Sequence, residues 1–409
     1  MSTIVLAYSG GLDTSVLLKK FVLEGQRTIA LTADLGEDDQ FAPRGAGQGA
    51  SPALEQVRQK ALALGAAEAV VVDARERFVE HFAWRALRAN ALYEGMYPLS
   101  AALSRPLIAD LLVSTAHEYG ATVVAHGCTG KGNDQVRIEL GVRALDPKLM
   151  CRAPLREAPL SRPDAIEFAR NNGVPVAHTA SKPYSIDANL WGRSIEAGIL
   201  EDPWNAPPED AYAWSVAPSS AAAQADEIVV RFDDGEPSLD GTRGAEMVAS
   251  LNALAGRHGI GRIDMVEDRV VGLKSREVYE CPGALVLIAA HRALERLVLT
   301  RDELRFKAQT DQKYAELVYD GLWMQPLREA LDAFNGAFAQ RMTGEVRMHL
   351  YRGSATINGV RSPLGLYREN LATYGAGDAF DHAAAGGFIA LAALPLEAHA
   401  EMQLQAVVP

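Results

Sequence analysis

The N-terminal part of the chain alternates short apolar runs with segments in which apolar residues recur at helical spacing. Apolar runs of strand length occupy residues 3–8, 28–33, 67–72 and 121–127. Helical patterns occupy residues 16–25 and 54–65 and a long segment that ends near Tyr119. A helix after Ser161, with Pro163 in its first turn and Asn171 to Gly173 at its end, closes the series. This alternation predicts a parallel sheet with helices on both faces.

The pattern changes beyond residue 173. Residues 203–223 are rich in Pro, Ala and Ser, which indicates a long irregular segment. Strand patterns follow at residues 227–232 and 345–360, the second a hairpin that turns near Arg352 to Ser354. Helical patterns lie between them, at residues 243–256, 282–298 and 310–338. We therefore expect an α/β fold in which a parallel-sheet domain (residues 1–173) precedes an α+β domain (residues 174–375).

The Ala-rich residues 376–409 are partly amphipathic and would be under-packed alone, so we expect a C-terminal arm that a contact between subunits buries. No stretch of the chain approaches the roughly 20 apolar residues that a membrane helix requires. Residues 3–8 lead into a strand pattern rather than a signal peptide. We therefore expect a cytoplasmic protein that does not enter a membrane.

Composition narrows the class of partner. The chain has 409 residues, of which 48% are hydrophobic and 22% charged, as in an ordinary soluble protein of two or three domains. Its formal charge is 40 − 52 = −12 without a Lys- or Arg-rich block, which disfavours a large nucleic-acid interface. Cys128, Cys151 and Cys281 are scattered, form no metal or redox motif, and are expected to be small buried fillers.

The loop after the first strand, Ser9 to Ser15, is a candidate phosphate site. A Gly-rich turn that opens a helix presents unpaired N–H groups and the positive end of the helix dipole. Gly10 and Gly11 allow close approach, the hydroxyl side chains add donors, and Asp13 could help hold Mg²⁺ or orient the helix. The loop has neither the Walker A nor the Gly-x-Gly-x-x-Gly pattern. On this segment alone a turn in which Asp13 or Thr14 caps the helix remains an equal alternative.

A second loop, Gly127 to Asp134, also lies between a strand and a helix. The carboxyl ends of parallel strands share one edge of the sheet, so both loops should face the same side. Arg137 offers a planar fork suited to a carboxylate, and Thr129 and Asn133 could hold a second one. The alternative is that Asn133 and Asp134 cap the helix while Arg137 pairs with Glu139 or solvent. A glycine cluster at residues 45–49 mimics a dinucleotide loop, but no strand precedes it, and a flexible insertion is the expected interpretation.

Residues 7–15, AYSGGLDTS, resemble the loop of N-type ATP pyrophosphatases, which cleave ATP between its α and β phosphates. Five further segments are similar to argininosuccinate synthases and occur in the same order. They are residues 126–140, 185–203, 258–282, 314–323 and 362–367. The resemblance implies an N-type ATP pyrophosphatase domain followed by a synthetase domain and an oligomerisation arm.

The resemblance also implies a reaction and a set of site residues. The activity would be a ligase reaction of arginine biosynthesis that joins citrulline and aspartate with Mg-ATP, through a citrullyl-adenylate, in a homotetramer. The implied ATP-binding residues are Ala7, Tyr8, Ser9, Gly10, Gly11, Leu12, Asp13, Thr14, Ser15, Ala33 and Gly127. The implied aspartate-binding residues are Thr129, Asn133 and Asp134. The implied citrulline-binding residues are Tyr97, Ala102, Asn133, Arg137, Ser185, Ser194, Glu267 and Tyr279.

Asp13 and Arg137 are the residues that we expect to act in catalysis, and no metal ligand is assigned. Ala102 has no polar side chain, so any contact there must use its backbone. The chain departs from the family pattern in an acidic, long segment from Gly36 to Pro52 and in Asp268, where an Asn would be expected. Neither departure removes a required group.

The alternatives are another enzyme with the same loop, of the tRNA-thiolating or the amidotransferase type, and a non-catalytic nucleotide sensor. A tRNA-thiolating enzyme needs reactive cysteines and a basic RNA-binding face, and an amidotransferase needs a glutaminase domain for which the length leaves no room. A non-catalytic nucleotide sensor would not be expected to carry the second loop, Arg137 and the segment with Glu267 and Tyr279.

Overall fold

The computed structural model describes residues 2–36, 51–175 and 184–406. The glycine cluster at residues 45–49 and most of the acidic segment lie outside this part. The chain divides into two compact units, residues 1–364 and 365–409. The predicted domain boundary at residue 173 lies inside the first unit and stays a prediction.

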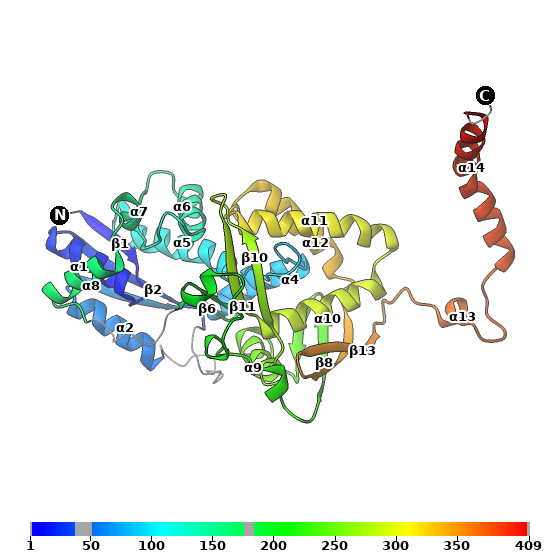
Figure 1. The fold of residues 1–409 in the computed structure, drawn as a ribbon, viewed down its shortest axis with the longest axis horizontal. Helices are drawn as coiled ribbons and strands as arrows, with labels where there is room; N and C mark the ends of the chain where they lie inside the picture. Colours follow the sequence, from blue (N-terminus) through cyan, green and yellow to red (C-terminus); the bar gives the residue numbers. More distant parts are fainter. Residues whose placement is uncertain (1, 37–50, 176–183, 407–409) are drawn as a thin grey trace. The chain divides into compact units, whose positions relative to one another are not determined.

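A five-stranded parallel sheet forms the N-terminal part of the first unit (Figure 1). Its strands lie in the order β3 (Glu68–Asp73), β2 (Arg27–Asp34), β1 (Thr3–Ala7), β4 (Val123–Ala125) and β5 (Met150–Arg152). Its principal helices are α1 (Leu12–Leu23), α2 (Pro52–Ala63), α5 (Ser100–Glu118), α6 (Asp134–Leu145) and α8 (Arg162–Asn171). The sequence predicted this sheet without β5, which is only three residues long.

Side-chain alternation along β1 separates the two faces of this sheet. Ile4 and Leu6 pack in one buried cluster with Val16 and Leu17 of α1. Val5, between them, belongs to a second cluster that contains residues of α5 and α6. Because successive side chains of a strand point to opposite faces, helices cover both sides of the sheet, as the sequence predicted.

Two antiparallel sheets follow in the first unit. One has the order β10 (Arg262–Asp268), β11 (Lys274–Glu280), β7 (Gly192–Glu196) and β6 (Ser185–Asn189). The other has the order β13 (Ser354–Arg361), β12 (Gly344–Tyr351), β8 (Asp226–Asp233) and β9 (Glu236–Leu239). The hairpin of β12 and β13 turns at Arg352 and Gly353, which have φ of 41° and 85°, as predicted. The first of these sheets was not predicted as strands, although β10 alternates buried and exposed residues.

The helices of this part are α9 (Gly244–Gly256), α10 (Pro282–Val298), α11 (Arg301–Tyr319) and α12 (Pro326–Ala339). A single helical pattern over residues 310–338 is therefore wrong. Gly321 has φ of +79°, and a Cβ there would lie 2.8 Å from the Cα of Arg137. Pro326 then starts α12, where its missing N–H costs nothing. The break brings the end of α11 against Arg137.

Shorter segments connect these elements. They are α3 (Arg75–Phe78), the π-helical Val79–Ala83, α4 (Trp84–Arg88), α7 (Pro154–Glu157) and the 3-10 turns Gly198–Glu201, Glu209–Ala211 and Pro218–Ser220. The last two turns are the only helical pieces within residues 203–223, so the predicted irregular segment is confirmed.

The second unit contains α13 (Glu369–Ala372) and α14 (His382–Ala406). Phe388 and Leu391 of α14 are each 72% exposed. Residues His382–Leu404 are long and apolar enough, by length and composition, to cross a membrane. The expectation that no stretch approaches that length is therefore wrong, because alanines and leucines outweigh the few charged residues of this helix. A core helix of a soluble protein can pass the same test.

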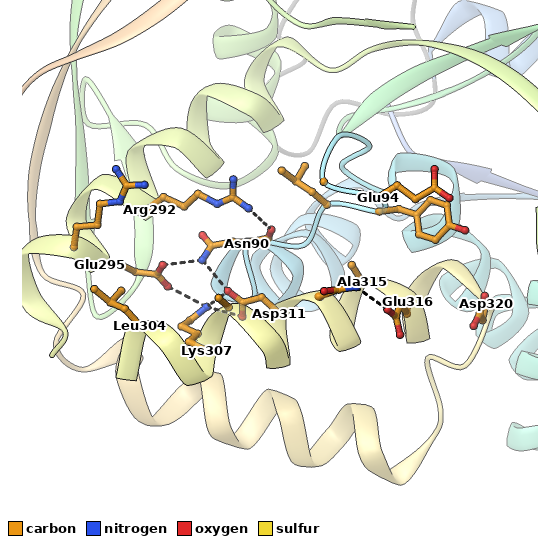
Figure 2. A pocket seen from close by; sticks show the side chains of 16 residues that line it. Asn90, Glu94, Arg292, Glu295, Leu304, Lys307, Asp311, Ala315, Glu316 and Asp320 are labelled. Atoms are coloured by element: carbon orange, nitrogen blue, oxygen red, sulfur yellow. Dashed lines mark hydrogen bonds and ion pairs between the residues drawn. The ribbon is translucent and has the colours of Figure 1, made fainter. Parts of the chain in front are cut away.

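A buried polar network joins α10 and α11 beside a cavity of about 890 Å³ (Figure 2). Asn90 Nδ2 donates to Glu295 Oε2 at 2.7 Å and to Asp311 Oδ2 at 3.0 Å. Lys307 Nζ donates to both oxygens of Asp311 at 2.7 Å. His291 Nδ1 lies 2.8 Å from Asn90 Oδ1. Burial lowers the pKa of His291 to about 4.

We expect His291 to make the fold sensitive to acid. Folded His291 stays neutral down to about pH 4, whereas an unfolded histidine takes up a proton near its ordinary pKa of 6.5. The unfolded state thus binds more protons between these values, and the free energy of unfolding should fall by up to roughly 3 kcal/mol as pH falls through this range. His291→Gln should therefore narrow the difference between the Tm at pH 7 and at pH 5. An unchanged difference would contradict this assignment.

Candidate active site

The loop between β1 and α1 leaves the start of the helix open. Gly10 has φ of +76°, and Gly11 is the N-cap residue, with no side-chain cap. The alternative in which Asp13 or Thr14 caps the helix is therefore wrong. The first N–H groups of a helix have no partner within it, so they point at whatever occupies the loop. Asp13 is exposed beside them.

The hydroxyl groups of the loop divide into two sets. Tyr8 and Ser15 are buried, and their oxygens lie 3.1 Å apart, so they fix the base of the loop. Ser9 Oγ lies 3.2 Å from Thr14 Oγ1 nearer its rim. Ala7 and Ala33 are half-buried in β1 and β2, and Leu12 opens α1. Ser9 and Thr14 are therefore the hydroxyls best placed for phosphate oxygens.

Lys60 of α2 also reaches this loop, and the sequence did not single it out. Its Nζ donates to Gly10 O at 2.7 Å, and burial lowers its pKa. Val57, one turn earlier on the same face of α2, packs against Gly10. No motif marks Lys60, because the contact joins residues 50 positions apart.

The two Gly-rich loops meet at the sheet edge. Strands β1 and β4 are parallel neighbours, with Leu6 opposite Ala125. A Cβ on Gly127, just after β4, would lie 3.1 Å from Thr14 Cγ2. Glycine thus allows this close approach without displacing Thr14. The prediction that both loops face one side of the sheet is confirmed.

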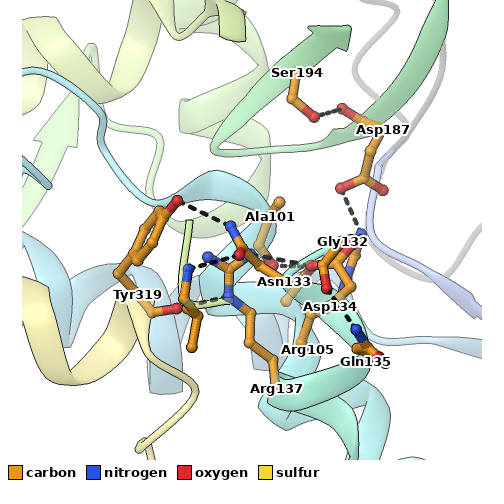
Figure 3. Close-up of polar contacts among 12 residues, drawn as sticks. Ala101, Arg105, Gly132, Asn133, Asp134, Gln135, Arg137, Asp187, Ser194 and Tyr319 are labelled. Carbon is orange, nitrogen blue, oxygen red and sulfur yellow. Dashed lines mark hydrogen bonds and ion pairs between the residues drawn. The ribbon is translucent and has the colours of Figure 1, made fainter. Parts of the chain in front are cut away.

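Asn133, the N-cap residue of α6, and Arg137 on α6 are held by residues distant in sequence (Figure 3). Asn133 Nδ2 donates to Tyr319 Oη at 2.9 Å, and Val270 N donates to Asn133 Oδ1 at 2.9 Å. Arg137 Nε donates to Tyr319 O at 2.8 Å and its Nη1 to Asp134 Oδ1 at 3.0 Å. The pairing of Arg137 with Glu139 is therefore wrong. Arg137 Nη2 is buried and has no hydrogen-bond partner in the described structure.

Two arginines flank Asp134. Arg105 Nη2 donates to its Oδ2 at 2.7 Å, and Arg137 binds its other oxygen. Burial alone would raise the pKa of Asp134, but the two guanidinium groups outweigh burial and lower it to about 2. Asp134 therefore stays ionised, as a carboxylate that binds an ammonium group must.

Glu267 of β10 lies among tyrosines that come from β11, from the end of α11 and from the segment before α5. Tyr279 Oη donates to Glu267 Oε2 at 2.6 Å, and Tyr319 donates to its Oε1. The rings of Tyr97 and Tyr279 stack with centroids 3.9 Å apart, and Tyr93 stacks on Tyr319 at 3.4 Å. Tyr319 thereby joins Asn133, Arg137 and Glu267. The sequence included Tyr319 only within the segment 314–323, without assigning it a role.

The remaining predicted residues lie in different surroundings. Ser194 on β7 pairs across strands with Tyr279 and with Asp187, whose backbone oxygen accepts from Ser194 Oγ at 3.3 Å. Ser185 starts β6 and is exposed, as is Thr129 in the second loop. Ala102 is buried on α5.

The cysteines and Asp268 can also be placed. Cys281 is buried as predicted, whereas Cys128 and Cys151 are only half-buried. Burial raises the pKa of Cys128 and of Cys151 to about 12, so neither is an activated thiolate.

Asp268 turns away from Glu267, is exposed and pairs with Lys274 at 2.6 Å. The cavity in Figure 2 is lined by no predicted site residue.

Comparisons with known proteins match this chain nearly end to end. A family model described as the arginosuccinate synthase N-terminal HUP domain matches residues 3–175, and one described as the arginosuccinate synthase C-terminal domain matches residues 184–399. Argininosuccinate synthase from Geobacillus kaustophilus is 50% identical over 405 residues, which cover 98% of this chain and 97% of that protein. The enzyme from Rubrobacter xylanophilus is 51% identical over 395 residues, covering 96% and 93%.

Among solved structures, a 4-thiouridine synthetase–RNA complex with bound ATP aligns with 42% of this chain and 41% of that chain, at 16% identity and a TM-score of 0.31. That similarity is too low to support an inference about function. The family models and the relatives that are about 50% identical cover nearly the whole chain, so they do show the family. The chain belongs to the argininosuccinate synthase family.

Proposed function

We propose that this chain carries out the reaction of its family: citrulline, aspartate and ATP give argininosuccinate, AMP and diphosphate. The ureido oxygen of citrulline attacks the α-phosphate of ATP, and the amino group of aspartate then displaces AMP from the citrullyl-adenylate. One observation carries the proposal. Arg137 Nη2 is buried without an acceptor among the described residues, beside two loops that meet at one sheet edge. A buried guanidinium N–H without a partner is costly, and a substrate oxygen would satisfy it.

These contacts support the predicted subsites. The first loop and Gly127 would hold ATP, with Ser9, Thr14 and the open end of α1 against the phosphates. Thr129, Asn133 and Asp134 would bind aspartate. The predicted citrulline residues Tyr97, Ala102, Asn133, Arg137, Ser185, Ser194, Glu267 and Tyr279 lie on α5, α6 and the sheet of β6, β7, β10 and β11 or beside them. Catalysis of this kind rests on positioning and charge neutralisation.

Asp13 fits a role with Mg²⁺. Within the described residues there is no cluster of three or more His, Cys, Asp or Glu side chains that could hold a metal ion. Mg²⁺ bound with a nucleotide needs only one or two carboxylates besides the phosphates, and Asp13 is an exposed carboxylate on the loop. When bound, the ion would neutralise phosphate charge.

Asp13→Asn is expected to lower turnover on the order of tenfold or more and to leave Tm unchanged, because Asp13 has no hydrogen bond or ion pair that supports the described fold. Steady-state rates at several Mg²⁺ concentrations test this. If the variant keeps the wild-type rate at every concentration, Asp13 has no part in metal binding.

One assay separates the proposed reaction from its rivals. The protein is mixed with Mg-ATP, and AMP and diphosphate are measured with citrulline and aspartate omitted in turn. Release of AMP and diphosphate that requires citrulline, with product that requires aspartate, supports the proposal. Release of ADP and phosphate, or indifference to both amino acids, would overturn it in favour of another ATP-using enzyme or a nucleotide sensor.

We further infer a cytoplasmic homotetramer without a nucleic-acid partner, held in part by the second unit. The net charge of −12 disfavours a polyanion, and the exposed apolar side chains of α14 suit a contact with another copy of the chain. Deletion of residues 376–409 should lower the mass of the assembly, measured by light scattering after size exclusion. A full-length protein that pellets with lipid vesicles instead would assign α14 to a membrane.

A further inference from the structure

Two carboxylates from different elements meet at one arginine in the candidate site. Arg105 Nη2 donates to Asp134 Oδ2 and to Asp187 Oδ2, each at 2.7 Å (Figure 3). Arg105 is buried on α5, Asp134 opens α6, and Asp187 lies in β6. The sequence assigned a role to Asp134 but none to Asp187.

The two carboxylates differ in their free bonding capacity. Both oxygens of Asp134 accept from guanidinium groups, one from Arg105 and one from Arg137. Asp187 has only Arg105 as a side-chain partner, so its Oδ1 accepts no hydrogen bond in the described part of the chain. The Asp187 side chain is 35% exposed, so its free oxygen can meet a ligand.

Asp134 and Asp187 also differ in how readily they take up a proton. The charged groups that act on Asp187 are Arg105 from α5 and Asp134 and Arg137 from α6. Burial raises the pKa of Asp187, Arg105 opposes that rise, and repulsion from Asp134 adds to it. Two carboxylates close together resist ionising together. Asp134 keeps its charge, and Asp187 is the one better able to take up a proton.

Asp187 also lies between the two predicted amino-acid subsites. Arg105 connects it to Asp134 on the aspartate side. Its cross-strand partner Ser194 is a predicted citrulline residue, and Ser194 Oγ donates to Asp187 O. Glu267, the buried carboxylate of the site, accepts hydrogen bonds from tyrosines at both oxygens. Asp187 is thus the carboxylate with an open oxygen where the amine of aspartate would approach citrulline.

We propose that Asp187 is the general base that takes a proton from the ammonium group of aspartate in the second half of the reaction. The proton passes to Asp187 Oδ1, and the electron pair left on nitrogen forms the C–N bond to the ureido carbon of the citrullyl-adenylate. The C–O bond to AMP breaks, and its electrons leave on the phosphate oxygen, which takes up a second proton from the amine nitrogen. The third amine proton stays on the guanidinium product. The proposal rests on the proposed function. A base is needed because an amine is a nucleophile only after its ammonium form has lost a proton.

Two assays on Asp187→Asn test the proposal by separating the two halves of the reaction. Citrulline-dependent exchange of labelled diphosphate into ATP reports adenylate formation without aspartate. Argininosuccinate formation in a single turnover reports the aspartate step. We expect exchange within about twofold of wild type and an aspartate step slower on the order of 10²-fold or more. The difference in the aspartate-step rate between Asp187→Asn and wild type should shrink as pH rises, because more of the aspartate in solution is then already a free amine.

Asp264→Asn is the matched control, because Asp264 also pairs with an arginine, Arg276, at 2.7 Å on the edge strand β10 and is exposed. Asp187→Glu, which retains a proton acceptor, should keep part of the aspartate-step rate and provides a second test if the Asn variant folds poorly. Wild-type aspartate-step rates in Asp187→Asn, or equal loss of exchange and product, would overturn the role as base. Absence of citrulline-dependent exchange in the wild-type chain would instead overturn the proposed function itself.

Discussion

Arg137→Lys should lower kcat/KM for citrulline on the order of 10²-fold. Lysine keeps the positive charge but loses the planar fork that binds Asp134 Oδ1 and Tyr319 O and leaves Nη2 for a substrate oxygen. Each charge-assisted hydrogen bond is worth about 1.5–3 kcal/mol, and about 1.4 kcal/mol corresponds to a tenfold change. Steady-state kinetics with each of the three substrates varied in turn would measure the effect. The KM for ATP should change least, because the hydrogen bonds of Arg137 within the described residues go to Tyr319 and Asp134 and not to the first loop.

A matched variant is available on the same helix. Arg143 is exposed near the end of α6, so Arg143→Lys makes the same chemical change away from the site. Arg143→Lys should leave kcat/KM for each of the three substrates near its wild-type value. If the two variants behave alike, Arg137 does not bind citrulline. A parallel loss of Tm in Arg137→Lys, with kinetics unchanged in the surviving folded fraction, would reduce Arg137 to a structural role.

Gly10→Ala should raise the KM for ATP and lower kcat, together on the order of tenfold or more. Its Cβ would lie 2.9 Å from Val57 Cγ2, a distance at which either the loop or α2 must move. The carbonyl of Gly10 also accepts from Lys60 Nζ, so a displaced turn would carry that contact with it. A shift of about an ångström at a group that orients the reacting phosphate is costly for catalysis.

The control for Gly10→Ala separates backbone strain from the clash. Gly25 has φ of +73°, close to that of Gly10, but a Cβ there meets nothing within 4 Å. Both alanine variants should lose roughly 1–2 kcal/mol of stability from the left-handed conformation, and only Gly10→Ala should lose ATP affinity. Val57→Ala in the Gly10→Ala background should restore part of the activity. Equal kinetics in both single variants would contradict the role assigned to the clash.

Local pattern was sufficient for elements whose signals lie within a few residues. Strands β1 to β4 and helices α2 and α8 were predicted near their observed bounds, because apolar period, caps and breakers act locally. For α5 only the end was predicted, and α1 was predicted from residue 16 although it starts at Leu12. The single helix over residues 310–338 was wrong because the pattern continues across Gly321, whereas the close approach to Arg137 that requires a glycine is a tertiary contact. The sheet of β6, β7, β10 and β11 was missed because its strands carry many charged residues that pair across the sheet, as Arg193 does with Glu280.

The site shows the same division. The sequence alone indicated the site residues that lie in a short motif at a strand end. They are Gly10, Gly127, Asn133, Asp134 and Arg137. Lys60 and Arg105 lie in no motif, and the segments that contain Tyr319 and Asp187 assigned no role to them. The importance of these four residues appears only where the fold brings them to partners 50, 29, 186 and 82 positions away.

The sequence by itself determined the family, the parallel sheet and the two Gly-rich loops, because spacing and residue type specify backbone geometry over short distances. Only the tertiary structure decided which charges are paired. Asp134 is held by two arginines and stays ionised, whereas Asp187 shares one of them and keeps an open oxygen. A pKa and a free lone pair depend on every neighbour within a few ångströms, and those neighbours come from segments that the chain order keeps apart.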